Sequence, residues 1–419
     1  SRLDKLCSLL LALCPILQHY NGMYMNAGYT AVILVSPYLI LNLLYKIKNG
    51  KNDSQCFYAL IPMMLFQFFK MADHKMTVSK IFYAAFIMTI FIAAVLGSVN
   101  IKYFIKSATI ICFAATICLI IQYILYYGLD FHLQLVPTSL LLPKSEQWIL
   151  GAKTGLYGIT GRSNGFYRPC AFFLEPAHMF LYAFPILCML LFSPDMNKNR
   201  IGAAAFITAG MLLSTSGMGS SVAIGIWCAY FALYNSKYNP QNSARLKNLI
   251  SVKTIATLTL VLVALIIAYF KVEVFRNSIL RIFTSKFSGT STAIDGRTKG
   301  ARKLVADMVG KELLFGVTEN VEDIKFHLPG FYATLYKYGL TGIFLSYWFY
   351  VSGIIRLRGA GFWVSLIILV ISFFSAHTHG TFYMIYYLIV LMNSYHMEGL
   401  YKEKEWRKNS HASTDCSCV

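Results

Sequence analysis

The stretch Tyr167-Arg168-Pro169-Cys170-Ala171-Phe172-Phe173-Leu174-Glu175-Pro176-Ala177-His178 runs directly into the apolar segment MFLYAFPILCMLLF, residues 179–192. An arginine, a carboxylate and a histidine therefore stand at the edge of a segment with the composition of a membrane span. Charged groups are expensive at this depth and are usually kept there for binding or for chemistry. The stretch predicts a helix inside a membrane with a polar site at its beginning.

The rest of the chain is as apolar as this segment. Of its 419 residues, 57% are hydrophobic and 13% are charged, and the mean hydropathy is +0.56. Soluble domains average roughly 45–50% apolar and about 25% charged residues. Runs that approach the length needed to cross a bilayer recur along the chain, so we expect an all-α, polytopic membrane bundle of about 12 transmembrane helices.

The expected spans are residues 6–19, 29–45, 56–70, 81–98, 107–127, 171–193, 201–214, 218–234, 254–270, 329–352, 361–376 and 380–396. Lysines and arginines of most connections then fall on one side, which the positive-inside rule assigns to the cytoplasm. The exception is the connection that carries Lys70, Lys75 and Lys80. This orientation predicts a multi-pass protein of the plasma membrane with both termini in the cytoplasm.

The domain organisation follows from the same spans. Residues 1–396 form one transmembrane domain, which includes two long outer loops, 128–170 and 271–328, and residues 397–419 form a cytoplasmic tail. Connections of this length are usually functional or disordered.

The second outer loop is strongly basic in its first half. Its cations are Lys271, Arg276, Arg281, Lys286, Arg297, Lys299, Arg302 and Lys303, against Glu273 and Asp295. One interpretation is a solvated cationic loop that touches lipid headgroups. The other is an anion site, because guanidinium groups bind phosphate oxygens in pairs of hydrogen bonds and keep their charge. The natural guest of such a site would be a pyrophosphate.

Several other classes of function find no support. The net charge of +19 is largely explained by the lysines and arginines of the cytoplasmic connections and of the basic loop, and the sequence shows no nucleic-acid-binding module. Most of the ten cysteines lie in or beside apolar spans, so no disulfide framework is expected. His377 and His379 alternate as metal ligands can, but no further ligand stands at a suitable spacing.

Four segments resemble the Wzy-type polymerases of O-antigen and capsular polysaccharide. They are YRPCAFFLEPAHMFLYAFPILCMLLF (167–192), LLSTSGMGSSVAIGI (212–226), FSGTSTAIDGRTKGA (287–301), and LLFGVTEN (313–320) followed by HLPGFYATLYKYGLTGI (327–343). They occur in the order that the family has, with the outer loops where the predicted topology puts them. The second segment departs from the family, which often has an arginine where this chain has Gly217-Met218.

The resemblance implies a GT-C-like glycosyltransferase that needs neither a metal nor another cofactor. Its donor would be a glycan on undecaprenyl pyrophosphate, and its acceptor would be a second lipid-linked repeat unit. The chain would lengthen O-antigen, capsule or exopolysaccharide on the outer face of the bacterial cytoplasmic membrane. A flippase and a chain-length regulator of the same pathway would be its partners, together with the lipid bilayer.

Such a reaction needs cations that hold the diphosphate and neutralise its developing charge. Arg168 and Arg297 are the first candidates, with Arg281 and Arg302 as further binding residues. Arg168 precedes a proline at the membrane edge, although an interfacial arginine without a binding role would look the same. The acceptor hydroxyl must lose a proton, and the resemblance assigns that role of general base to His327.

Glu175 and His178 stand three residues apart and share one helix face. They fit a carboxylate-oriented imidazole that acts as a second base, and they also fit a buried polar pair that packs two helices. Glu175 is equally suited to anchor Arg168 or Arg162 and so to shape a phosphate site. The sequence leaves these alternatives open.

Two other functions use the same residues or the same class of fold. An O-antigen-type ligase would transfer the glycan to a different acceptor and would share nearly all of the site. A transporter or flippase of lipid-linked sugars would show inverted repeats, broken helices at the midplane and charges along a path across the membrane. The charged candidates here gather on one face, which favours chemistry at the surface.

Overall fold

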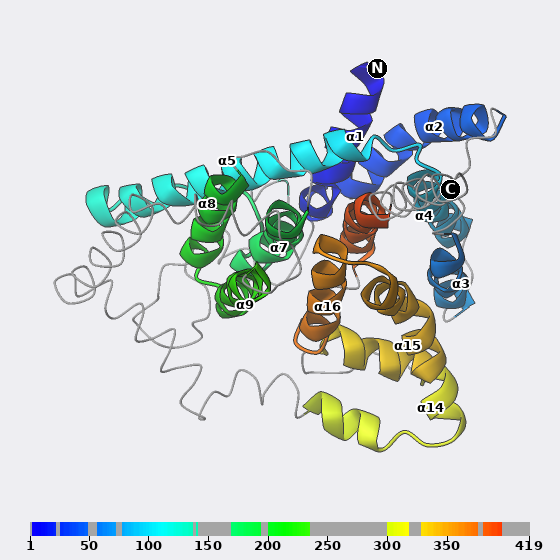
Figure 1. Ribbon diagram of the computed structural model, residues 1–419. Coiled ribbons are helices and arrows are strands. Elements are labelled where there is room, and N and C mark those ends of the chain that lie inside the picture. The colour runs from blue at the N-terminus through cyan, green and yellow to red at the C-terminus, as the bar shows by residue number, and fades with distance from the viewer. Residues whose placement is uncertain are drawn as a thin grey trace, which may run out of the picture.

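The structure, a computed structural model, is built from helices (Figure 1). It describes residues 2–21, 26–48, 57–72, 78–136, 140, 169–193, 200–234, 300–317, 328–375 and 380–395. The helices are α1 (Arg2–Leu17), α2 (Ala27–Lys48), α3 (Phe57–Ala72), α4 (Val78–Val95), α5 (Ile101–Leu129), α7 (Pro176–Phe192), α8 (Arg200–Leu213), α9 (Gly217–Tyr234), α14 (Lys311–Phe315), α15 (Gly330–Arg356) and α16 (Ala360–Ser372). Residues 300–306 and 381–395 are helical as well.

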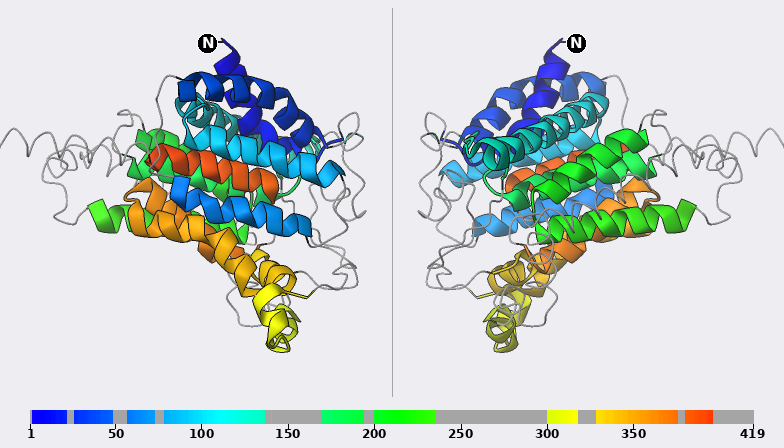
Figure 2. Two further views of the ribbon diagram at one scale, coloured as in Figure 1. Left: turned by 90° about the vertical axis from the view of Figure 1, so that its right-hand side faces the viewer. Right: turned by 90° about the vertical axis from the view of Figure 1, so that its left-hand side faces the viewer.

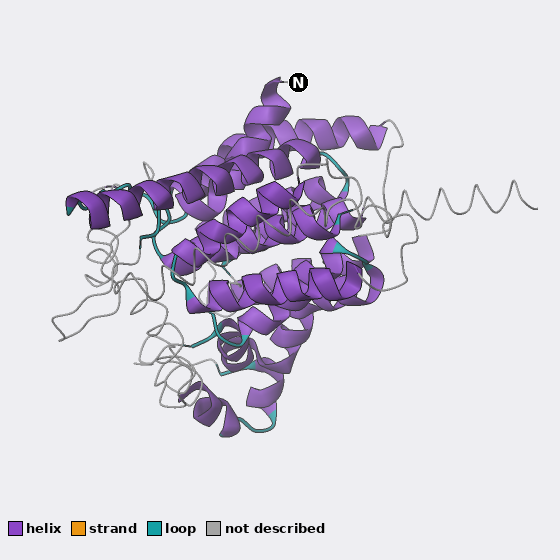
Figure 3. Cartoon of the chain, turned by 60° about the vertical axis from the view of Figure 1, so that its left-hand side comes forward, coloured by secondary structure: helices purple, strands orange, loops and turns teal. Residues whose placement is uncertain are grey.

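The described residues form no strand (Figure 3), and an isolated bridge joins Asn21 and Asn26. The all-α prediction is therefore confirmed for the described part of the chain. Each expected span within that part coincides with a helix, while the span at 254–270 lies outside it. The span drawn from residue 171 starts too early: its helix begins at Pro176, because proline is preorganised for the first helical position.

Three of the described helices, α2, α5 and α15, are long and apolar enough to cross a membrane. The surface of α5 supports a lipid environment, since isoleucines at positions 110, 117, 121 and 124 follow helical spacing and are 42–62% exposed. An isoleucine stripe of this kind is costly in water and favourable against hydrocarbon. The chain is therefore a helical membrane protein.

Most of the helices lie side by side, and α14 projects at one edge of the bundle (Figure 2). Two helical segments form the centre, namely α7 and residues 381–395, whose side chains are almost all buried. α7 contacts α5, α8, α9 and α16. This central position fixes the beginning of α7, which carries Glu175 and His178.

Proline and tyrosine together hold the centre. Pro185 lies inside α7 and has no N–H for the carbonyl of Leu181, four residues earlier. The hydroxyl of Tyr387 donates to that carbonyl at 3.1 Å. A backbone oxygen left without a donor would be expensive in a water-free interior, so the tyrosine compensates for the proline.

The same arrangement extends to one more helix, α1. The hydroxyl of Tyr386 donates to the Tyr182 carbonyl at 2.9 Å, and the hydroxyl of Tyr182 donates to the Ala12 carbonyl of α1 at 2.9 Å. Ala12 lies three residues before Pro15, inside another proline-interrupted helix. Residues 381–395, α7 and α1 are thus joined through side-chain donors and main-chain acceptors.

Tyr387→Phe is expected to destabilise the fold by about 1–3 kcal/mol, because the buried Leu181 carbonyl loses its donor while the ring volume stays the same. The measurement is thermal unfolding of the purified protein in lipid nanodiscs. Tyr336→Phe is the matched control, since Tyr336 is a helical tyrosine that is only half-buried. Equal melting temperatures for the two variants would contradict this role of Tyr387.

α15 is broken at Gly339, which has φ +62° and ψ −163°. Its first part packs against α14, with the N–H of Val317 donating to the Tyr336 carbonyl at 2.8 Å. Lys337 belongs to this first part. The break places Lys337 before the straight run of the helix, which begins only after Gly339.

Candidate functional site

Residues 169–175, called the 169–175 turn below, lead into α7 and are folded into the bundle. The N–H of Ala171 donates to Oε1 of Gln122 on α5 at 3.0 Å. The hydroxyl of Tyr20, just beyond the end of α1, donates to the Phe172 carbonyl at 3.4 Å. Side chains from two helices therefore fix the shape of the turn that follows Arg168.

Ala171 also carries backbone strain. Its φ of +52° lies in the left-handed region, which residues other than glycine rarely adopt. Such a conformation costs about 1–3 kcal/mol and persists only where the surrounding contacts impose it, often at functional sites. The turn is thus held in one conformation by its contacts rather than by its own preference.

Tyr20 stays a hydrogen-bond donor over the physiological pH range. Burial raises its pKa to about 12, and the neighbouring thiol of Cys170 adds to the rise. Tyr20 packs against a small apolar cluster of Val136, Cys170 and Leu174. The hydrogen bond that Tyr20 donates to the 169–175 turn is therefore insensitive to moderate changes in pH.

Glu175 occupies the N-cap position of α7. Its backbone is extended, and Pro176 follows it at the first helical position. A carboxylate is favourable at a helix N-terminus, where the helix dipole is positive. The side chain is half-buried and lies within electrostatic reach of Tyr383, from the helical residues 381–395.

His178 lies one turn further along α7 and is fully buried. Its ring stacks on the ring of His19, with a centroid distance of 4.6 Å and an interplanar angle of 13°. The ring of Tyr383 is 6.3 Å away, and the hydroxyl of Tyr383 donates to the His178 carbonyl at 3.1 Å. Of the alternatives that the sequence left open, these contacts favour a polar residue that packs helices together.

The structure brings two of the predicted site residues together and separates a third. Glu175 and His178 share the first turn of α7, as their spacing predicted. Arg302 is exposed on the helical residues 300–306, which lie with α14 at the edge of the bundle (Figure 1). Five candidates lie outside the described residues, namely Arg162, Arg168, Arg281, Arg297 and His327.

Two of these five border described positions. Arg168 immediately precedes the buried Pro169, and His327 immediately precedes Leu328 at the entry to α15. That entry is tied to the end of α16, because the N–H of Gly330 donates to the Ser375 carbonyl at 2.9 Å.

Among the described residues, no group of three or more histidine, cysteine, aspartate or glutamate side chains is placed to hold a metal ion. His377 and His379 lie outside them. The expectation of a metal-independent reaction stays a prediction.

The serine-rich segment packs helices. Ser214 and Ser216 are buried in the turn between α8 and α9, and the hydroxyl of Ser216 accepts from the N–H of Gly219 at 3.3 Å. A Cβ on Gly219 would lie 2.9 Å from Cβ of Phe180 on α7. Small residues let α9 approach the central helix closely.

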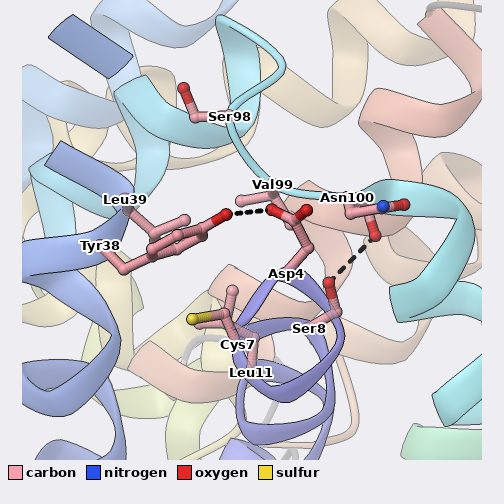
Figure 4. A pocket seen from close by; sticks show the side chains of 9 residues that line it. All are labelled: Asp4, Cys7, Ser8, Leu11, Tyr38, Leu39, Ser98, Val99 and Asn100. Atoms are coloured by element: carbon pink, nitrogen blue, oxygen red, sulfur yellow. Dashed lines mark hydrogen bonds between the residues drawn. The ribbon is translucent and has the colours of Figure 1, made fainter. Parts of the chain in front are cut away.

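A shallow crevice lies at the other end of α1 (Figure 4). It is lined by Asp4, Cys7, Ser8, Leu11, Tyr38, Leu39, Ser98, Val99 and Asn100. The hydroxyl of Tyr38 donates to the Asp4 carboxylate, and Ser8 donates to the Asn100 carbonyl at 3.1 Å. Fifteen positions separate Asp4 from His19, about 22 Å along a helix, so the crevice is remote from the 169–175 turn and serves to join α1, α2 and α5.

Sequence reasoning missed His19, Gln122 and Tyr383. His19 stands at the end of the first predicted span, where it is 6% exposed and packs on His178. Its position at the end of one predicted span matches that of His178 at the start of another, on the same predicted side of the membrane. That shared depth was the available signal.

Fold and composition thus define an integral membrane protein whose described core is helical. A strained and hydrogen-bonded turn leads into its central helix α7. No protein-family model, curated protein or solved structure matches the chain.

Proposed function

We propose that the chain is a membrane glycosyltransferase that polymerises undecaprenyl-pyrophosphate-linked repeat units on the outer face of the bacterial cytoplasmic membrane. The proposal includes a bundle of about 12 spans with both termini in the cytoplasm. One structural observation carries most weight: the turn directly after Arg168 is buried, strained at Ala171 and fixed by Gln122 and Tyr20. A plain interfacial loop would need no such construction.

In the proposed reaction, Arg168 and Arg297 bind the diphosphate of the donor, assisted by Arg162, Arg281 and Arg302. His327 accepts the proton of the acceptor hydroxyl. The acceptor oxygen forms a bond to the anomeric carbon of the donor glycan as the bond from that carbon to the pyrophosphate oxygen breaks. Undecaprenyl pyrophosphate leaves with the electron pair, and the arginines neutralise its charge.

Glu175 and His178, at the start of α7, support this site. A carboxylate at the N-terminus of α7 is placed to orient an arginine of the preceding stretch. The buried His178 keeps the first turn of α7 packed against α1. These roles are structural and require no contact with the sugar.

The test uses the purified full-length chain in nanodiscs with a lipid-linked repeat unit isolated from the source cells. A ladder of products, each longer by one unit, together with released undecaprenyl pyrophosphate, is the expected result. Transfer of a single glycan to an added acceptor without a ladder would instead identify a ligase. Movement of the unit across the bilayer without new glycosidic bonds would identify a transporter.

A further inference from the structure

The stacked pair of His19 and His178 has properties that neither ring has alone. Both rings are buried, at 6% and 0% exposure, and they lie face to face at 4.6 Å. Ring N–H groups point outward in the plane of each ring. Parallel rings therefore cannot donate to one another, and each influences the other through charge and stacking.

Such a pair responds differently to a first and to a second proton. One imidazolium above the face of a neutral imidazole is an attractive arrangement of the cation–π kind. Two imidazolium groups at this separation repel each other strongly, because the buried surroundings screen charge poorly. The titration then belongs to the pair rather than to either residue.

The neighbouring groups agree with a single positive charge. Glu175 lies one turn earlier on α7, and Tyr383 approaches from the helical residues 381–395. Tyr20 and Cys170 contribute a hydroxyl and a thiol from the end of α1 and from the 169–175 turn. Among these described groups Glu175 is the carboxylate, and a negative charge nearby favours the first proton on the pair.

We propose that His19 is a positioning residue of the outer site and that His19 and His178 act as one unit that accepts a single proton. A second proton separates the end of α1 from the start of α7. Because Tyr20 follows His19 and holds the Phe172 carbonyl, this separation displaces the 169–175 turn. Acidification outside the membrane thereby switches the site off, and this activity part of the inference rests on the proposed function.

The stability of the protein gives a test that needs no substrate. Well above about pH 6.5, the ordinary pKa of histidine, the unfolded chain binds no proton at these two residues. Below it, the unfolded chain binds two protons where the folded pair binds one. Stability therefore falls as the pH decreases, because the unfolded state then binds more protons.

The variants are His19→Phe, His178→Phe and the double variant, each of which preserves an aromatic stack. Between pH 7 and pH 5, the melting temperature of the unchanged protein is expected to fall by at least about 2 °C more than that of any of the three. The two single substitutions remove the same effect, so the double substitution removes no more than either one. His132→Phe, at an exposed histidine, is the control and keeps the full pH dependence.

If the single substitutions change the pH dependence by independent, additive amounts, or leave it unchanged, the pair is not one unit and the inference is overturned. His19→Ala, which removes the stack as well, is expected to lower the melting temperature at every pH. This variant separates the packing role of the ring from its protonation.

The activity arm distinguishes the two proposals. In the polymerisation assay, the pH profile of the unchanged protein, scaled to its own maximum, is expected to fall on the acid side below about pH 6.5. His19→Phe loses this acid limb. If the melting temperatures differ with pH as expected but no polymer is made, the proposed function alone is overturned. If polymer is made and the unchanged protein and His19→Phe have identical pH profiles of melting and of activity, the proposal of a histidine pair is overturned.

Discussion

Arg168→Ala is expected to lower the rate of ladder formation at least about 100-fold, the usual cost of removing one group that stabilises charge in a transition state. The guanidinium would bind the leaving diphosphate through two parallel hydrogen bonds. Arg168→Lys keeps the charge and loses this geometry, so it is expected to recover only part of the rate. Arg297→Ala and His327→Ala are expected to abolish the ladder as well, since they remove the second cation and the general base.

The measurement is the initial rate of repeat-unit addition, with insertion of each variant checked by its yield and melting temperature. Arg358→Ala is the matched control, because Arg358 is exposed in the connection between α15 and α16, on the predicted cytoplasmic side. It should polymerise like the unchanged protein. Normal ladders from Arg168→Ala, Arg297→Ala and His327→Ala together would show that the site is assigned to the wrong residues, even if the chain polymerises.

Gly339→Ala is expected to lower strongly the fraction of protein molecules that fold. The conformation at Gly339 is one that only glycine adopts readily, and leaving it for alanine costs about 1–3 kcal/mol. A Cβ there would also lie 2.4 Å from the Leu314 carbonyl carbon, and overpacking of this kind typically adds about 1–3 kcal/mol. Together these costs, about 2–6 kcal/mol, reach the lower end of the stability of an ordinary domain, about 5–15 kcal/mol.

The yield of monodisperse protein and its melting temperature measure this effect. Gly225→Ala in α9 is the control, because a Cβ at that position meets nothing within 4 Å. It should be neutral or slightly stabilising, since alanine favours helix over glycine. A well-folded Gly339→Ala with an unchanged melting temperature would mean that α15 is not broken at this residue.

Most of the helices were predictable because each needs only a local apolar run, whereas α14 and the helical residues 300–306 lie within the predicted outer loop 271–328. The runs at 29–45 and 107–127 became α2 and α5 with longer ends, as expected where interfacial residues continue a helix beyond the bilayer. The beginning of α7 was misplaced by the apolar residues 171–174, which are buried in a turn instead. Apolar residues are buried both in helices and in turns that fold into the core, so hydropathy alone does not distinguish the two.

The features that depend on distant partners were not predictable. The break in α15 requires Gly316 and Gly339 to meet, since a Cβ on either would collide with the backbone beside the other. The stack of His19 on His178 depends on how the ends of α1 and α7 meet. The spacing of Glu175 and His178 predicted that they share a helix face. It did not predict that the ring of His19 stacks on that of His178.

The hydroxyls that Tyr383, Tyr386 and Tyr387 supply to α7 come from positions 204 to 206 residues later in the chain. During synthesis, α7 therefore leaves the ribosome and enters the bilayer long before these donors exist. The Leu181 carbonyl, which Pro185 leaves without a helical donor, must meanwhile accept a hydrogen bond from water or from another protein. We expect newly made chains to stay dependent on such help until the helical residues 381–395 are in place, which makes late termination of translation more damaging than its small loss of mass implies.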